Sequence, residues 1–368
     1  MAARPATRRL AERKLDGSQR PIVRDLGRGS SSFTIEWDVR PAFDFLFSLS
    51  GEAGSTDDLP AEDRRWLTET KAALPEAARA GLTEMFDSEL CINTGVLLID
   101  RPDVRTSAAF VDLLASTEPR DVIGPIVADH HNDRDIDEMI GRAIDGDTTV
   151  LTTLEKRLPD WNREALLAIL RDPAGARDRM VDVLSAWQKQ FAEIEPRIGE
   201  IIDRDYESRG GDRTTLAATD LIETTTGGIR WLPEPGVRRV ILGPSYFSRP
   251  YNFLMSGDDW RFFGYPVADA ALDPADSLAA PPSVVRLHRA LGDATRLKIL
   301  KLLASRDLYL TEIAQLLDLS KPTIKHHLAL LRSAGLVTIT ESGTVLYYSL
   351  RRNRLDDASG EIKRFLIG

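Results

Sequence analysis

Residues 319–337 read LSKPTIKHHLALLRSAGLV, and this stretch decides the fold of the C-terminal part of the chain. In a helix of about 100° per residue, Ile324, Leu328 and Leu331 gather on one side. The opposite side carries small or basic residues, namely Pro322, Lys325, His326 and Ala329. A helix of this kind is suited to pack on a core and to approach a groove lined by phosphates.

The segments before this helix predict three shorter helices. VVRLHRALG is closed by Gly292, a residue type that favours the end of a helix. Asp293 or Thr295 can cap the second helix, RLKILKLLA. The apolar face of that helix is predicted to contain Leu297, Leu300 and Leu303. TEIAQLLDL is the third helix, Asp318-Leu319 makes a turn, and Ser320 is placed to cap the fourth.

Two strands are predicted after the fourth helix. LVTIT and TVLYYSL alternate between apolar and polar residues, and Glu341-Ser342-Gly343 joins them as a hairpin turn. The order helix, helix, turn, helix, hairpin is that of a winged helix-turn-helix.

This C-terminal region is similar to the arsenical-resistance-repressor (ArsR) family of bacterial winged-helix transcription regulators. The similarity covers about residues 283–352 and is carried by ALGDATRLKILKLLA, LTEIAQLLDLSKPTIKHHLALLRSAGLV and YYSL. It implies a cytoplasmic homodimer that binds a palindromic DNA operator and represses transcription until an effector binds. Segments 283–291 and 355–368 are the dimer helices that it implies. The implied DNA contacts, with two nearby cations added, are Ser320, Lys321, Thr323, Lys325, His326, Arg332 and Arg351.

Three departures from the family pattern matter. Tyr309 and Thr311 stand where metal sensors of the family place two cysteines, and DDASGEIKRFLIG lacks the histidines of the other common metal site. We therefore expect no metal bound in these ways. The wing tip, ESGTVL, is not basic, so Arg351, Arg352 and Arg354 are candidates to replace its phosphate contacts.

The adjacent histidines of the fourth helix are predicted to do different things. Neighbouring helical residues diverge by about 100°, so the two cannot easily share a metal ion. His326 should face outward, whereas His327 should pack beside the apolar stripe with its ring hydrogen-bonded. A second pair, in ADHHNDRDIDE (128–138), is consistent with a divalent-cation site or with a solvated acidic loop, and we favour the loop.

Length and composition fit a protein of two or three domains. The chain has 368 residues, 42% of them hydrophobic and 29% charged. It has no apolar run long enough to span a membrane, and its one cysteine, Cys91, excludes an internal disulfide and suits the reducing cytoplasm. Cys91 lies between apolar residues, as a buried thiol does.

Charge is unevenly distributed. The formal net charge is −9, but residues 1–30 carry eight Lys/Arg against three acids, and residues 282–368 carry fourteen against eight. The middle of the chain is therefore strongly acidic. Contact with a polyanion, if made, is expected from the C-terminal domain.

We expect a mainly helical α+β protein. The predicted organisation is a flexible basic tail (1–30), an acidic N-terminal helical domain ending in a short β-rich region (31–272), a linker (273–282), the winged helix-turn-helix (283–352) and a C-terminal helix (353–368). Near residue 196 a proline should break the last long helix of the N-terminal domain, and Gly124-Pro125 and Asp172-Pro173 are predicted turns.

The segment GPSYFSRPYNFLMSGDDWRFFGYPV is the densest aromatic cluster of the chain. It suits a pair of core strands, an apolar effector pocket or a dimer surface. If it forms a pocket, the ligand-binding candidates are Arg249, Tyr251, Asn252 and Trp260, with Asp258 and Asp259 nearby.

The sequence contains no recognisable catalytic motif. It has no P-loop, no G-x-S-x-G, no nucleotide-binding G-x-G-x-x-G and no zinc-ligand spacing, so we name no catalytic residue and no cofactor. The expected function is a DNA-binding transcriptional repressor with an N-terminal domain that binds an effector or mediates assembly. The alternative is an enzymatic or ligand-binding N-terminal domain with an appended winged-helix docking module. Burial of Lys321 and Lys325 would instead favour a winged helix that contacts only proteins.

Overall fold

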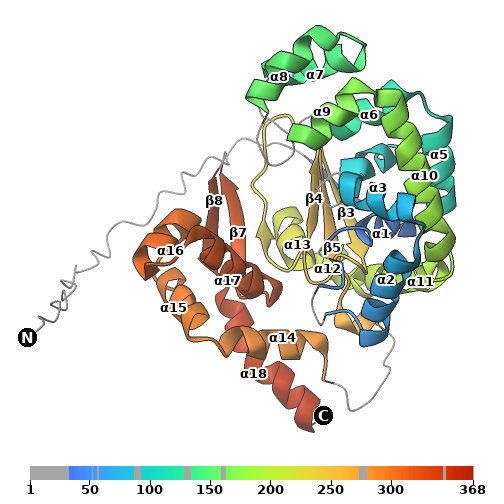
Figure 1. Ribbon diagram of the computed structural model, residues 1–368. Coiled ribbons are helices and arrows are strands. Elements are labelled where there is room, and N and C mark those ends of the chain that lie inside the picture. Colours follow the sequence, from blue (N-terminus) through green and yellow to red (C-terminus); the bar gives the residue numbers. More distant parts are fainter. Residues whose placement is uncertain are drawn as a thin grey trace, which may run out of the picture.

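The computed structural model describes residues 33–51, 53–55, 58–86, 93–127, 134–158, 163–272, 280–342 and 345–367. A large helical unit surrounds one sheet, and a smaller C-terminal unit contains a second (Figure 1). Helices with two small sheets agree with a mainly helical α+β class. The predictions for the basic tail, Cys91 and the histidines of ADHHND fall outside the described residues. In the described part of the chain, no helix is both long and apolar enough to cross a membrane.

The first sheet is the centre of the N-terminal unit. Its strands are, in spatial order, β1 (Thr34–Trp37), β3 (Arg239–Ser245), β5 (Trp260–Pro266) and β4 (Phe253–Ser256). β3 runs parallel to both β1 and β5, and β4 runs antiparallel to β5. Three of these strands lie where a β-rich region was predicted at the end of the domain, and β1 joins them from its start. β1 lies beside strands from the other end of the domain, where its apolar residues Ile35 and Trp37 are partly buried against the core.

The two faces of this sheet have separate apolar cores. Ile241 and Phe262 join the core of the surrounding helices, where the Phe43 ring stacks on Phe262 at 4.5 Å between centroids. The other face is formed by Val240, Leu242, Phe263 and Tyr265 together with Phe33, Ile35 and Trp37. Alternate residues of SFTIEWDV, namely Phe33, Ile35 and Trp37, thus share one face of the sheet.

Two cross-strand glycines make room for aromatic rings. Gly243 and Gly264 are partners on β3 and β5. A Cβ atom would lie 2.6 Å from the Phe262 ring at Gly243 and 2.9 Å from the Phe47 ring at Gly264. Both positions therefore exclude larger side chains.

The helices of the N-terminal unit are α1 (Pro41–Phe47), α2 (Ala61–Ala73), α3 (Glu76–Phe86), α5 (Ser107–Ser116), α6 (Pro119–Val127), α7 (Arg134–Ile144), α8 (Leu151–Arg157), α9 (Arg163–Arg171), α10 (Pro173–Phe191), α11 (Glu195–Ser208), α12 (Gly210–Thr215) and α13 (Ala218–Thr225). Short 3₁₀ turns cover Thr94–Leu98, Thr148–Val150 and Asp269–Ala271. α10 packs on α3, α5 and α6 and buries Trp187, whose Nε1 donates to Ser48 at 3.0 Å.

The proline signals of this unit have mixed outcomes. Pro196 lies in the first turn of α11, so the predicted break is confirmed. Asp172 caps α10 by accepting from the Gly175 N–H at 2.9 Å, as expected of a turn before Pro173. The turn predicted at Gly124-Pro125 is wrong, because both residues lie inside α6 and its buried apolar side holds the helix together.

The C-terminal unit contains α14 (Pro282–Leu291), α15 (Ala294–Leu303), α16 (Leu310–Leu317), α17 (Lys321–Ser333) and α18 (Arg352–Ile367), with β6 (Leu308–Tyr309), β7 (Val337–Ser342) and β8 (Val345–Leu350). Asp293 caps α15 by accepting from the Arg296 N–H at 2.9 Å. The buried residues of α15 are Ile299, Leu300 and Leu303. Leu297 is 49% exposed, which corrects the predicted apolar face, because the side of α15 centred on Ile299 and Leu303 faces the core.

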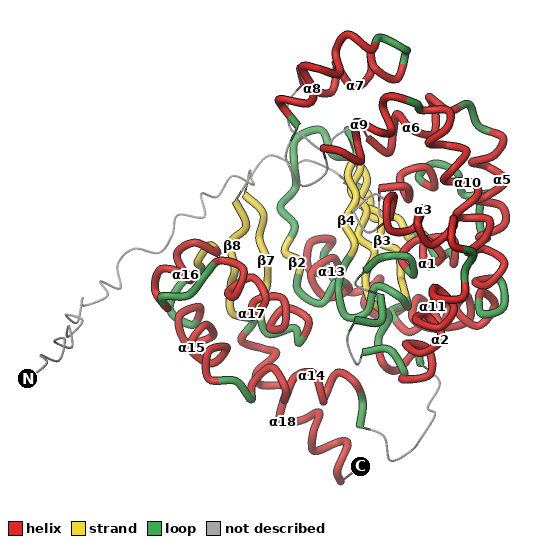
Figure 2. The backbone as a smooth tube through the Cα atoms, viewed as in Figure 1, coloured by secondary structure: helices red, strands yellow, loops and turns green. Residues whose placement is uncertain are grey.

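A strand of the N-terminal unit joins the second sheet. β2 (Ile229–Arg230) runs parallel to β7, and the order is β2-β7-β8-β6 (Figure 2). The Ile339 N–H donates to the Gly228 carbonyl at 3.2 Å. Gly228 has φ +129°, where a side chain is strained, so this junction depends on glycine. The two units are therefore joined through a shared sheet.

Candidate nucleic-acid interface

The junction between α16 and α17 has the geometry of a helix-turn-helix. Asp318 ends α16 in the left-handed conformation, with φ 54°. Ser320 then caps α17, its hydroxyl accepting from the Thr323 N–H at 3.3 Å and lying 2.7 Å from the Thr323 hydroxyl. The predicted turn and cap are confirmed.

The two sides of α17 differ as predicted. Ile324, Leu328 and Leu331 are buried in the core of the C-terminal unit. The exposed residues of the helix and its cap include all five contacts implied by the family resemblance: Ser320, Lys321, Thr323, Lys325 and His326. The helix therefore offers hydroxyl, ammonium and imidazole groups to a partner.

The exposed side of α17 borders two different neighbours. Helical spacing places Lys321, Lys325 and Arg332 along the edge toward the wing. Arg332 lies near Tyr348 of β8, where burial raises the pKa of the phenol and the Arg332 charge opposes that shift. On the other edge, His326 lines a cleft against the N-terminal unit together with Leu330 and Ser333.

His327 is packed, in agreement with the prediction, but its Nδ1 does not make the hydrogen bond expected of the ring. Its side chain is 16% exposed, and Nδ1 lies 3.9 Å from Asp293 Oδ1. This nitrogen finds no hydrogen-bond partner among the described residues, so the predicted hydrogen bond is not made through Nδ1. The side chain lies between α17 and the cap of α15, out of hydrogen-bonding reach of the carboxylate. Burial lowers the pKa of His327. In the same described part of the chain, no three His, Cys, Asp or Glu side chains gather to hold a metal ion.

The arginines after the wing lie at its base. The Arg351 side chain is beside Gly228 of the N-terminal unit, 3.8 Å from its Cβ position. Arg352 donates to the Ala304 carbonyl at 2.6 Å, and Arg354 pairs with Glu361. The structure thus places Arg351 at the junction with β2 and away from the turn of the wing.

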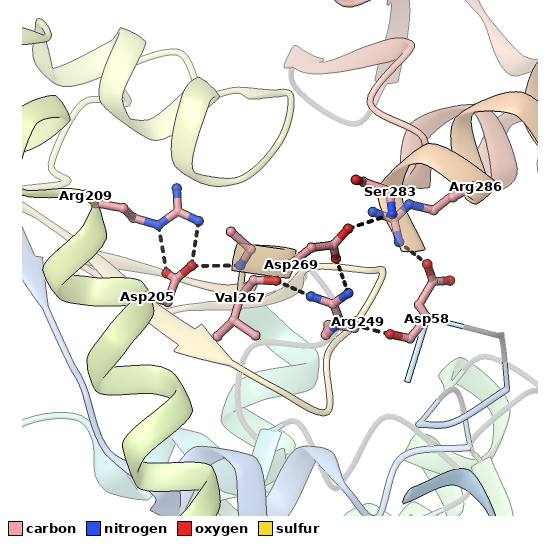
Figure 3. A network of polar contacts seen from close by, with 9 residues as sticks. Asp58, Asp205, Arg209, Arg249, Val267, Asp269, Ser283 and Arg286 are labelled. Carbon is pink, nitrogen blue, oxygen red and sulfur yellow. Dashed lines mark hydrogen bonds and ion pairs between the residues drawn. The ribbon is translucent and has the colours of Figure 1, made fainter. Parts of the chain in front are cut away.

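The four ligand-binding candidates of the aromatic segment do not converge on one cavity. Arg249 is 2% exposed and donates to the Asp58 carbonyl at 3.0 Å, the Val267 carbonyl and the Asp269 carboxylate (Figure 3). Asn252 donates to the Thr226 carbonyl at 3.0 Å, and the Trp260 ring lies over Gly257. Tyr251 lines the cleft beside α17. The segment forms mainly β4, β5 and their supports.

Arg249 belongs to a polar network between the two units. Asp269 accepts from Arg249 and, through its other oxygen, from the Ser283 N–H at 2.6 Å at the start of α14. Arg286 of α14 donates to Asp58 (Figure 3). The network therefore fastens the first helix of the C-terminal unit to the N-terminal unit.

A smaller cleft, of about 360 Å³, lies beside β1. Its charged residues pair with one another: Arg40 donates to Asp38 at 2.5 Å, and Arg239 to Glu36 at 2.8 Å and to Asp100 at 2.6 Å. These pairs hold the edge strand in place, which is a structural use of the charges.

The fold and the exposed side of α17 define a winged helix-turn-helix protein. Residues 293–338 match the model of the family described as "Bacterial regulatory protein, arsR family". The transcriptional repressor SdpR of Bacillus subtilis is 37% identical over 80 residues, which are 22% of this chain and 89% of that protein. The regulator KmtR of Mycobacterium tuberculosis is 38% identical over 72 residues, 20% of this chain and 55% of that protein. CmtR of Mycobacterium bovis is 35% identical over 85 residues, 23% of this chain and 72% of that protein.

The chain belongs to the ArsR family of transcriptional regulators. All of these matches concern the C-terminal region.

Proposed function

We propose that this protein is a homodimeric repressor that reads a palindromic operator with α17 and is regulated through its N-terminal unit. The observation that carries the proposal is the row of exposed polar and basic residues on α17, directly opposite a fully buried apolar stripe. SdpR, to which the chain is similar, is a repressor by name.

In this proposal the two kinds of exposed residue have different tasks. Lys321 and Lys325 neutralise phosphates, which releases counterions and makes binding sensitive to salt. Thr323 and His326 reach base edges in the major groove. The positive charge of residues 282–368 supports this assignment. Because both lysines are exposed, we do not favour a winged helix used for protein contact alone.

The proposed dimer forms through α18. α14 packs against α18 and is itself tied to the N-terminal unit by Arg286 and Asp58. α18 leaves Leu366 68% exposed and Ile367 82% exposed. A second copy that covers these residues must also place the two α17 helices roughly 34 Å apart on one side, because operator half-sites require that spacing.

The test is selection of DNA duplexes from a randomised pool, followed by affinity measurement at several salt concentrations. We expect a palindromic preference and an affinity that falls steeply with salt. Lys325→Ala should weaken binding to all sequences and reduce the salt slope by about 1. Lys298→Ala, which removes an exposed cation of α15, is the control. Recovery of no preferred sequence, with a flat salt slope, overturns the proposal.

A further inference from the structure

A cleft separates the exposed side of α17 from the N-terminal unit. Its volume is about 730 Å³. One wall comes from the N-terminal unit, with Ser55, Asp58 and Tyr251, and the other from α14, α15 and α17. His326, an implied DNA contact, lies in this second wall. Whatever fills the cleft therefore touches both units and the proposed DNA-reading helix.

The cleft has an excess of positive charge. Among the residues that the structure describes, its lining contains Arg286, Arg289 and Arg296 but one carboxylate, Asp58, which accepts from Arg286. Arg296 is held in place by the carbonyls of Ala290, at 2.8 Å, and Arg289, at 2.7 Å. Neither bond supplies a negative charge. An anion is the ligand that balances this lining.

Arg286 adds a second indication of an occupant. Its Nε is buried and has no hydrogen-bond partner among the described residues. Burial and the nearby Arg354 lower the pKa of Arg286 to about 10, and the Glu361 charge opposes that shift, so the group is cationic at neutral pH. An unpaired buried donor on a charged group is costly unless a ligand or water accepts from it.

Size and apolar lining favour an organic molecule over an inorganic ion. Val285, Leu330 and the Tyr251 ring contribute carbon surface. The volume lies within the range of about 300–1,000 Å³ that is typical of small-molecule sites, which often occur at domain interfaces.

We propose that this cleft binds a small organic anion with an apolar body, and that the bound anion weakens DNA binding by occupying the space in front of His326. The second part rests on the proposed DNA-binding function, whereas the first part does not. The ligand also bridges Asp58 and Tyr251 of one unit to α14 and α17 of the other, so it fixes their relative position.

The first experiment measures binding of 8-anilinonaphthalene-1-sulfonate, a fluorescent aromatic anion, to the full chain without DNA. We expect one saturable site per chain. Val285→Trp should fill the cleft and weaken binding at least tenfold, while Val285→Ala should not. Arg289→Glu should also weaken it at least tenfold, whereas Lys298→Glu, on the exposed side of α15, should leave it unchanged. Equal binding by the wild type, Val285→Trp and Arg289→Glu overturns the site. If Val285→Trp does not fold, Arg289→Glu alone still tests the site.

The second experiment adds the selected operator. We expect the saturating probe to weaken operator binding by the wild type about tenfold. Val285→Trp should bind operator in a way that does not respond to the probe. If Arg289→Glu weakens operator binding without probe and Lys298→Glu does not, the arginines serve DNA phosphates, and the proposed effect of the bound anion on DNA binding is overturned. Absence of any operator preference, with the probe site intact, refutes the DNA-binding function and leaves the anion site standing.

Discussion

Replacing Arg249 by methionine removes a guanidinium that is buried in the N-terminal unit. Arg249 is 2% exposed, pairs with Asp269 and donates to the carbonyls of Asp58 and Val267. Removing one partner of a buried ion pair costs about 3–5 kcal/mol, because the other charge is left without compensation. For a unit of this size, that loss corresponds to a melting temperature lower by about 6–20 °C. If Arg249 served a ligand instead, stability without ligand would change little.

Tryptophan fluorescence measures this effect in the right unit. All six tryptophans lie before residue 273, so urea unfolding followed by their emission reports on the N-terminal unit alone. Arg230→Met is the matched control, because Arg230 is half exposed and its pair with Glu223 is worth about 0–1 kcal/mol. In Arg249→Met/Asp269→Asn the unpaired charge is absent, so the double variant should recover part of the loss. An Arg249→Met variant within about 1 kcal/mol of the wild type, with no coupling to Asp269, would refute a structural role.

The remaining predictions concern the two histidines, the glycine contact and the dimer helix. His326→Ala should weaken specific binding to selected DNA by about 1–3 kcal/mol and leave the melting temperature unchanged. His327→Ala should lower the melting temperature and leave DNA binding unchanged. Fluorescence anisotropy measures the binding, and thermal melts measure the stability. Burial lowers the pKa of His327, so the unfolded chain binds a proton at this residue below about pH 6.5 that the folded chain does not. The winged helix should therefore lose stability as the pH falls below that value. Circular-dichroism melts at pH 5 and pH 7 should show a smaller loss of stability for His327→Gln than for the wild type. Gly264→Ala, whose Cβ would meet the Phe47 ring at 2.9 Å, should lower the free energy of unfolding in urea by about 1–3 kcal/mol. Gly211→Ala, whose Cβ would have no atom within 4 Å, should leave that free energy unchanged. Leu366→Glu should dissociate the proposed dimer in sedimentation without affecting the melting of the winged helix, and an unchanged mass would exclude α18 as the interface.

The sequence predicted the elements that depend on local signals. Ser320 and Asp293 cap the helices expected of them, and Pro196 separates α10 from α11 as its position predicted. Predictions from local signals were wrong where tertiary packing determined the secondary structure. Gly124-Pro125 reads as a turn by composition, but the buried side of α6 keeps it helical.

Pairings between distant segments could not be predicted. β2 has two paired residues, too few to carry a pattern, and its partner on β7 lies in the other unit. β1 likewise gains its partner on β3 from the far end of the domain. Strand partners are chosen by tertiary packing, and a single sequence shows only that a segment can be a strand.

The candidate site was also only partly predictable from the sequence. Exposure of Lys325 and burial of Leu328 follow from helical periodicity, so the exposed side of α17 was visible in the sequence. The cleft was not, because it is built from Ser55, Asp58, Tyr251 and parts of α14, α15 and α17 that only the fold brings together. The arginines Arg286 and Arg289 had one local signal, their position away from the buried stripe of α14.

Two separate attachments between the units bear on how regulation can work. One is the β2–β7 pairing at the wing, and the other is the network of Asp58, Arg286 and Asp269 at α14. A single attachment would let the winged helix rotate freely about it. With two, a change in the N-terminal unit must move α17 as a rigid body or break one attachment. Under the proposed function, both responses would alter the placement of α17 on DNA, so a modest rearrangement around the cleft would be sufficient to couple the units.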